Sequence, residues 1–152
     1  MRFITLSKFL LISLTPFVLF LLVAYIIGLN DSFFQDKILQ YGVQEKIPDA
    51  FSLHEKVVNF IKGKSNELPE QFNEREKQHL FDVKKIVKIS SILLLVFAFA
   101  FAVLLIISSF MLKINNYIIN FISRILISGG FLTLFLVVLL VSFIYFDFSA
   151  AF

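Results

Sequence analysis

The run ISSILLLVFAFAFAVLLIISSFML at residues 89–112 contains no charged residue, and it decides the fold. An α-helix rises about 1.5 Å per residue, so about 20 such residues cross a hydrocarbon core of roughly 30 Å. Two more uncharged apolar runs lie at residues 9–29 and 125–146. The three runs predict an all-α membrane protein with three transmembrane helices set in a lipid bilayer.

Composition favours a membrane fold over a soluble one. The 152 residues are 59% hydrophobic and have a mean hydropathy of +0.88, which is more apolar surface than a soluble domain of this size buries. The first run, preceded by Arg2 and Lys8, also resembles a signal peptide. Such a peptide has an apolar core of only ~7–15 residues and a small-residue cleavage site after it. We therefore expect an uncleaved span, kinked at Pro16.

Charge and residue types exclude several classes of function. Ten basic and ten acidic residues lie between residues 30 and 88, so this segment lacks the clustered positive charge of a nucleic-acid surface. Cysteine is absent, which excludes disulfides, a thiolate nucleophile and a cysteine-based metal site. The chain has only two histidines, His54 and His79, which argues against a histidine-rich metal centre. We expect no cofactor, no metal and no nucleic-acid partner.

Basic residues next to short loops predict the orientation. Arg2 and Lys8 precede the first run, and Lys113 and Arg124 flank the short connector at residues 113–124. These four residues belong on one side of the membrane, which the positive-inside rule makes cytoplasmic. The lysines just before the second run argue against this assignment, although their alkyl stems allow the ammonium groups to meet lipid phosphates.

The predicted organisation is that of a multi-pass protein of the cell membrane with a cytoplasmic N-terminus. Isoleucines in the connector favour a brief interfacial helix, and Gly129 with Gly130 favours close approach of the third span to a neighbouring helix. The expected segments are residues 1–29 (N-terminus and first span), 30–88 (extracytoplasmic helical segment), 89–112 (second span), 113–124 (cytoplasmic connector), 125–146 (third span) and 147–152 (extracytoplasmic end).

Two helix starts can be read from the polar segment. Ser52 and Glu55 have the spacing of a capping box, in which each side chain accepts a hydrogen bond from the other residue's backbone N–H. This helix is expected to stop at Gly63. Asn73 and Glu76 repeat the pattern, and no proline or glycine follows before the end of the second apolar run. We expect the second helix to continue unbroken into that span.

The second helix carries the residues that are candidates for catalysis. Glu76, His79 and Asp82 are successive i,i+3 neighbours on one side of it. A carboxylate beside an imidazole fixes its tautomer and supports its protonated form, as a general base requires. The spacing alone favours an ordinary solvated helix face. His54 lies within the first predicted capping box, and we expect it to be a surface residue.

Three stretches resemble the family of multi-pass membrane proteins that includes lipoprotein intramolecular transacylase (Lit). The stretch FNEREKQHLFDVK at residues 72–84 is similar to the family motif FNEREXXHLXDVK. Residues 57–63, VVNFIKG, and residues 146–152, FDFSAAF, are similar to two further family stretches. The resemblance covers nearly the whole chain, and its HL-x-DVK core is the specific part.

The resemblance implies four spans, with an external domain between the first and the second. In the transacylase branch, the sn-2 acyl chain of a lipoprotein's diacylglyceryl-cysteine passes to the α-amine of that cysteine. A diacylated lipoprotein is therefore the implied partner. By the same resemblance, His79 is the catalytic base of an acyltransferase, and Asp82 and Glu76 orient the imidazole or the substrate.

The sequence departs from the family pattern at its end. In the family, a second histidine and a fourth span follow the FDFSAAF-like stretch, whereas this sequence ends at Phe152. We expect a chain that is truncated before the last span, that takes the second histidine from a partner, or that has lost the activity. The alternative function is thus a noncatalytic membrane protein, either a partner-binding subunit or a lipid-facing scaffold.

Overall fold

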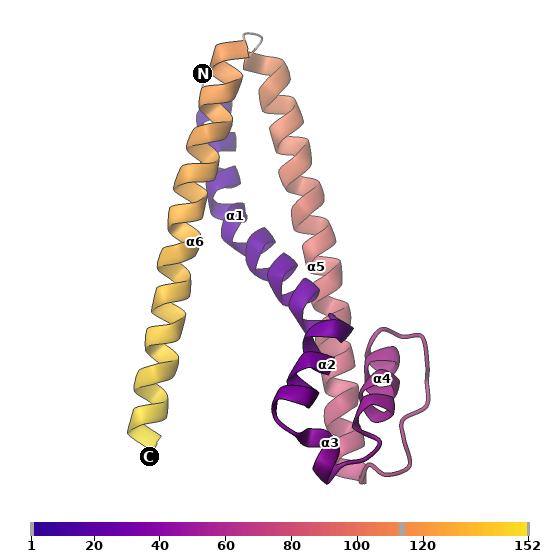
Figure 1. Cartoon of the computed structure of the whole chain (residues 1–152). Coiled ribbons are helices and arrows are strands. Elements are labelled where there is room, and N and C mark those ends of the chain that lie inside the picture. The colour runs from indigo at the N-terminus through magenta and orange to yellow at the C-terminus, as the bar shows by residue number, and fades with distance from the viewer. Residues whose placement is uncertain (1, 113–114, 152) are drawn as a thin grey trace. The chain divides into compact units, whose positions relative to one another are not determined.

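The computed structural model describes residues 2–112 and 115–151, without the side chains of 115–116 and 147–151. Lys113 and Phe152, which the sequence analysis used, lie outside these residues. All regular structure in the described ranges is helical, which confirms the predicted fold class (Figure 1). The helices are α1 (Arg2–Gly28), α2 (Asp31–Gln40), α3 (Val43–Lys46), α4 (Ala50–Ile61), α5 (Glu74–Leu112) and α6 (Asn115–Ala151).

Three helices are long and apolar enough to cross a membrane, as the three apolar runs predicted. They are α1, α5 and, in α6, the portion Tyr117–Phe146. Each extends beyond its apolar run, and α1 passes through Pro16 without ending. The prediction of a brief helix within the connector at 113–124 is wrong. Helix α6 begins at Asn115 and continues from there through the third apolar run. No proline or glycine separates these residues from the third span, so nothing ends the helix between them.

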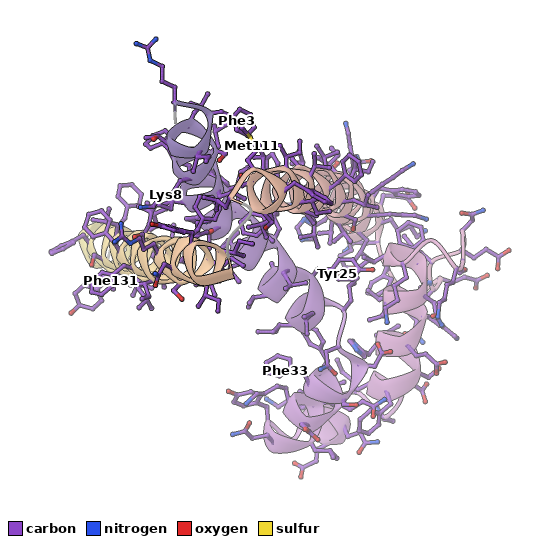
Figure 2. All side chains as sticks on the ribbon, turned by 90° about the horizontal axis from the view of Figure 1, so that it is seen from above. Phe3, Lys8, Tyr25, Phe33, Met111 and Phe131 are labelled. Atoms are coloured by element: carbon purple, nitrogen blue, oxygen red, sulfur yellow. The ribbon has the colours of Figure 1, made fainter. Side chains whose placement is uncertain are left out.

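The described chain forms two compact units, one reaching to Leu22 and resuming at Leu94, the other spanning Val23–Leu93. In the first unit, Leu11, Phe121 and Ile125 form a small buried cluster. The outward-facing side chains of these helices are apolar and exposed, as Phe131 shows at 75% exposure (Figure 2). Lipid is the solvent that such a surface requires.

Small and polar residues bring the helices of the first unit close together. A Cβ added at Gly129 would lie 2.6 Å from Oγ1 of Thr15, so α1 and α6 meet where the glycine removes side-chain bulk. This confirms the packing role predicted for Gly129, whereas a Cβ at Gly130 would meet nothing within 4 Å. In addition, the Ser108 hydroxyl on α5 donates a buried 2.9 Å hydrogen bond to the Ser7 hydroxyl on α1.

The second unit contains two helices that the sequence analysis did not predict, α2 and α3. The Asn30 side chain begins α2 by accepting a 3.1 Å hydrogen bond from the Phe33 N–H. Helix α4 supplies the core of this unit, since Phe60 is 0% exposed and Val58 and Ala50 are 6% exposed. Its end at Gly63 is confirmed, because that glycine takes a left-handed φ of +74°.

The capping box predicted at Ser52 is wrong. Helix α4 starts two residues earlier, at Ala50, with Asp49 in the N-cap position and no side-chain capping bond. The Leu53 N–H donates 2.9 Å to the Asp49 carbonyl, which is already a helical bond. The turn containing Pro48 therefore sets the start, with Ile47 extended before it, and Ser52 lies inside the first turn.

Candidate functional site

The start of α5 is built by a reciprocal pair of hydrogen bonds. The Glu76 N–H donates 2.9 Å to Oδ1 of Asn73, and the Asn73 N–H donates 2.9 Å to Oε2 of Glu76. This confirms the second predicted capping box. The helix then continues without a break to Leu112, so His79 stands one turn inside a fixed helix start. The carboxylate of Glu76 is therefore occupied as a capping group.

A surface hollow of about 600 Å³ lies beside this first turn and includes the imidazole of His79. Its wall combines apolar groups from α4, from the turn before α5 and from α5 itself with three polar side chains. The lining residues are Val57, Phe72, Arg75, Glu76, His79 and Leu80.

The structure brings together two of the three predicted site residues. His79 and Glu76 line the same hollow, whereas Asp82 is not part of its wall. All three side chains are exposed. Among the described residues, no hydrogen bond or ion pair joins His79 to either carboxylate. The i,i+3 spacing thus places the groups on one helix without forming a hydrogen-bonded triad.

Arg75 is a residue of the hollow that the sequence analysis gave no role. Its guanidinium carries a fixed positive charge and several N–H donors, which suits a site where negative charge develops on an oxygen. A signal for it was present in the sequence, because Arg75 stands between the two glutamates of the FNERE motif. On the same wall, Val57, Phe72 and Leu80 offer an apolar surface.

His79 lies on α5 well before the uncharged run begins. Ten residues separate His79 from Ile89, where the uncharged run begins, which is about 15 Å along the helix axis. The headgroup layer on each side of a bilayer is thinner than that, at roughly 5–8 Å. If the uncharged run starts at the hydrocarbon boundary and α5 stands along the membrane normal, His79 would lie beyond the headgroup layer.

The sequence predicted that His54 is a surface residue. This prediction is wrong for its Nε2 atom, which is buried. Its Nε2 atom is covered and has no hydrogen-bond partner, and its ring lies 5.1 Å from that of Phe34. Burial lowers the pKa of His54 below its ordinary value, Asp31 opposes the shift, and Lys62 adds to it. The covered nitrogen is out of reach of a substrate, whereas the imidazole of His79 lies in the wall of the hollow.

Comparison with known families identifies the chain. The family described as lipoprotein intramolecular transacylase Lit matches residues 8–152. The chain belongs to the Lit family. The resemblance carried by the FNERE and HL-x-DVK residues is thereby confirmed, and membership in a family that modifies lipoproteins fits a protein of the cell membrane. No curated protein and no solved structure gives a significant match.

The described residues of this Lit family member contain no group of three or more histidine, aspartate or glutamate side chains able to hold a metal ion. The groups at hand in the hollow are one imidazole, one guanidinium and a capping carboxylate beside an apolar wall. This set suits proton transfer together with stabilisation of an oxyanion.

Proposed function

We propose that this Lit family member transfers an acyl chain within a diacylated lipoprotein, on the extracytoplasmic side of the membrane. The observation that carries the proposal is the hollow that holds His79 beside Arg75 and an apolar wall. In the reaction, the α-amine of the lipoprotein's first cysteine attacks the carbonyl carbon of the sn-2 ester. The C–O bond of the ester breaks, an amide forms, and the glycerol carries a free hydroxyl.

His79 serves as the general base in this scheme. It accepts the proton that the amine loses as its nitrogen bonds to the carbonyl carbon, and it returns that proton to the departing glycerol oxygen. The guanidinium of Arg75 stabilises the negative charge on the tetrahedral intermediate. Because amine and ester belong to one molecule, positioning supplies much of the acceleration. No serine or cysteine nucleophile is needed.

The remaining residues of the hollow position the substrate and the imidazole. The apolar side chains of Val57, Phe72 and Leu80 receive the start of the acyl chain when the ester is raised to the level of His79. Glu76 holds the start of α5 by accepting a hydrogen bond from the Asn73 N–H, and it contributes to the wall of the hollow. Asp82, one turn further along α5, orients the imidazole or the substrate once the substrate is bound.

The test is product formation by the full chain expressed beside a diacylated lipoprotein, read by mass spectrometry of the N-terminal lipopeptide. We expect the unaltered chain to give an N-acyl, lyso-glyceryl product. His79→Gln should lower its rate of formation by about 10²–10⁴-fold. His54→Gln is the matched control and should retain the activity, because its Nε2 is covered.

The outcomes separate this proposal from its alternative. Unchanged product in His79→Gln would remove the general-base assignment while leaving the acyl transfer in place. No product from the unaltered chain would support the noncatalytic alternative, in which this Lit family member binds a partner or lipid without turning over. A substrate with an ether in place of the sn-2 ester should give no product with any variant, because it has no carbonyl to attack.

A further inference from the structure

A second hollow, of about 500 Å³, lies within the unit Val23–Leu93 and shares no residue with the hollow of His79. It differs in character, because its wall combines three lysines with aliphatic side chains. Its lining includes Tyr25, Leu29, Lys62, Lys84, Lys88 and Ile92. We call it the lysine pocket.

The lysine pocket carries uncompensated positive charge. Lys62 forms an ion pair with Asp31 at 3.2 Å. Lys84 has its ammonium 4.0 Å from the centre of the Phe60 ring and donates 3.4 Å to the Ser65 carbonyl, neither of which neutralises its charge. Lys88 is exposed and forms no ion pair with a described residue. No carboxylate lines the pocket. Among the described residues, the three ammonium groups therefore have one acidic partner, Asp31, which pairs with Lys62.

The pocket lies where the polar segment meets the apolar runs. Lys88 is the last charged residue before the uncharged run at 89–112, and Ile92 belongs to that run. Tyr25 and Leu29 also line the pocket and lie at the end of the first apolar run. This transition from charged to apolar side chains marks the headgroup level of a bilayer, where tyrosine and lysine are also favoured.

We propose that the lysine pocket binds the headgroup of an anionic phospholipid. The phosphate oxygens accept hydrogen bonds from Lys84 and Lys88, and the glycerol and first acyl carbons lie on Leu29 and Ile92. An acidic peptide would use the ammonium groups but not the apolar wall, which favours a lipid. The pocket is also separate from the reaction site, since Lys88 lies nine residues, about 14 Å, beyond His79 along α5.

The test measures which lipid stays bound to the purified full chain, by native mass spectrometry from detergent micelles. The micelles contain equal amounts of phosphatidylglycerol and phosphatidylcholine, and a parallel sample adds water-soluble sn-glycerol 3-phosphate. We expect the unaltered chain to retain phosphatidylglycerol in preference to phosphatidylcholine. Lys88→Gln should lower phosphatidylglycerol retention about fivefold, as expected for one lysine at a charged lipid surface, and leave phosphatidylcholine retention unchanged.

Lys85→Gln is the matched control, because Lys85 is exposed on the same helix and does not line the pocket. It should retain phosphatidylglycerol as the unaltered chain does. An equal loss in Lys85→Gln and Lys88→Gln, or no preference for phosphatidylglycerol in the unaltered chain, would overturn the proposal. Displacement of the lipid by glycerol phosphate would overturn its lipid part in favour of a free phosphate. Since no acyl transfer is measured, the result does not depend on the proposed catalytic activity.

Discussion

Different interactions stabilise the packing inside each of the two compact units of this chain. In the unit made of α1 as far as Leu22, α5 from Leu94 and α6, which we call the membrane unit, small or polar residues join the helices beside a small apolar cluster, as Thr15 does against Gly129. In the unit Val23–Leu93, which we call the water-facing unit, the buried core is apolar and includes one aromatic ring, with Phe60 fully buried and its ring 5.0 Å from that of Phe81. The same helices α1 and α5 take part in both.

The solvent explains this difference. A helix in lipid gains little by burying an apolar side chain, because the lipid tails are as apolar as the protein, so close backbone approach and interhelical hydrogen bonds stabilise the packing. A helix in water gains by removing an aromatic ring from the solvent. The bonded pair Ser7–Ser108 and the ring of Phe60 are the clearest members of each type. Substitutions in each unit, each with a control in the same unit, test whether these different interactions stabilise it.

The largest effect is expected from Phe60→Ala in the water-facing unit. This substitution removes a fully buried ring together with its contacts to Phe81 and to the Lys84 ammonium, and should lower the free energy of unfolding of the unit by about 3–5 kcal/mol. Amide hydrogen exchange across α4 would report the change as lost protection. Leu39→Ala is the control, because Leu39 is 61% exposed. Equal loss of protection in both variants would contradict the role of the Phe60 ring in the core.

A smaller effect is expected from Gly129→Ala in the membrane unit. The new methyl group would lie within 2.6–2.8 Å of three atoms of Thr15, and overpacking of this kind costs about 1–3 kcal/mol. Thermal unfolding of the purified protein in detergent, followed by circular dichroism, measures it. Gly130→Ala gains the same helix propensity without a close contact, so it should match or exceed the unaltered stability. If both alanines behave alike, α1 and α6 do not meet at Gly129.

Features set by local chemistry could be predicted from the sequence. The length of the uncharged runs predicted the three spanning helices, and the Asn73–Glu76 pair predicted the start of α5. In each case, neighbouring residues supply the interactions that determine the structure. The start of α2 was equally local. Asn30 followed by an acidic first turn is an N-cap signal that neighbouring residues supply in full.

Features that depend on distant contacts could not be predicted in this way. The S-x-x-E spacing at Ser52 fits a capping box, but the same four residues fit equally well inside a first turn, and the turn at Pro48 decides between them. The hollow around His79 needs Val57 from another helix, which no spacing within α5 reveals. The covering of His54 likewise depends on Phe34, twenty positions away.

The smallest effect expected is a pH dependence confined to the water-facing unit and caused by His54. Burial lowers the pKa of the folded-state imidazole below the ordinary value of 6.5, with Lys62 acting in the same direction and Asp31 in the opposite one. The unfolded chain therefore takes up the proton first as the pH falls. The contribution to stability is fully present above about pH 6.5 and is lost as the pH falls toward the folded pKa.

Hydrogen exchange of Ala50–Ile61 at pH 7 and pH 5, corrected for intrinsic exchange rates, measures this dependence. We expect protection to fall at pH 5 in the unaltered chain. His54→Phe keeps an aromatic ring against Phe34 but cannot take up a proton, so its protection should change less between the two pH values. The membrane unit has no histidine and supplies the internal reference. Equal losses in the variant would show that carboxylates, rather than the covered imidazole, make α4 sensitive to acid.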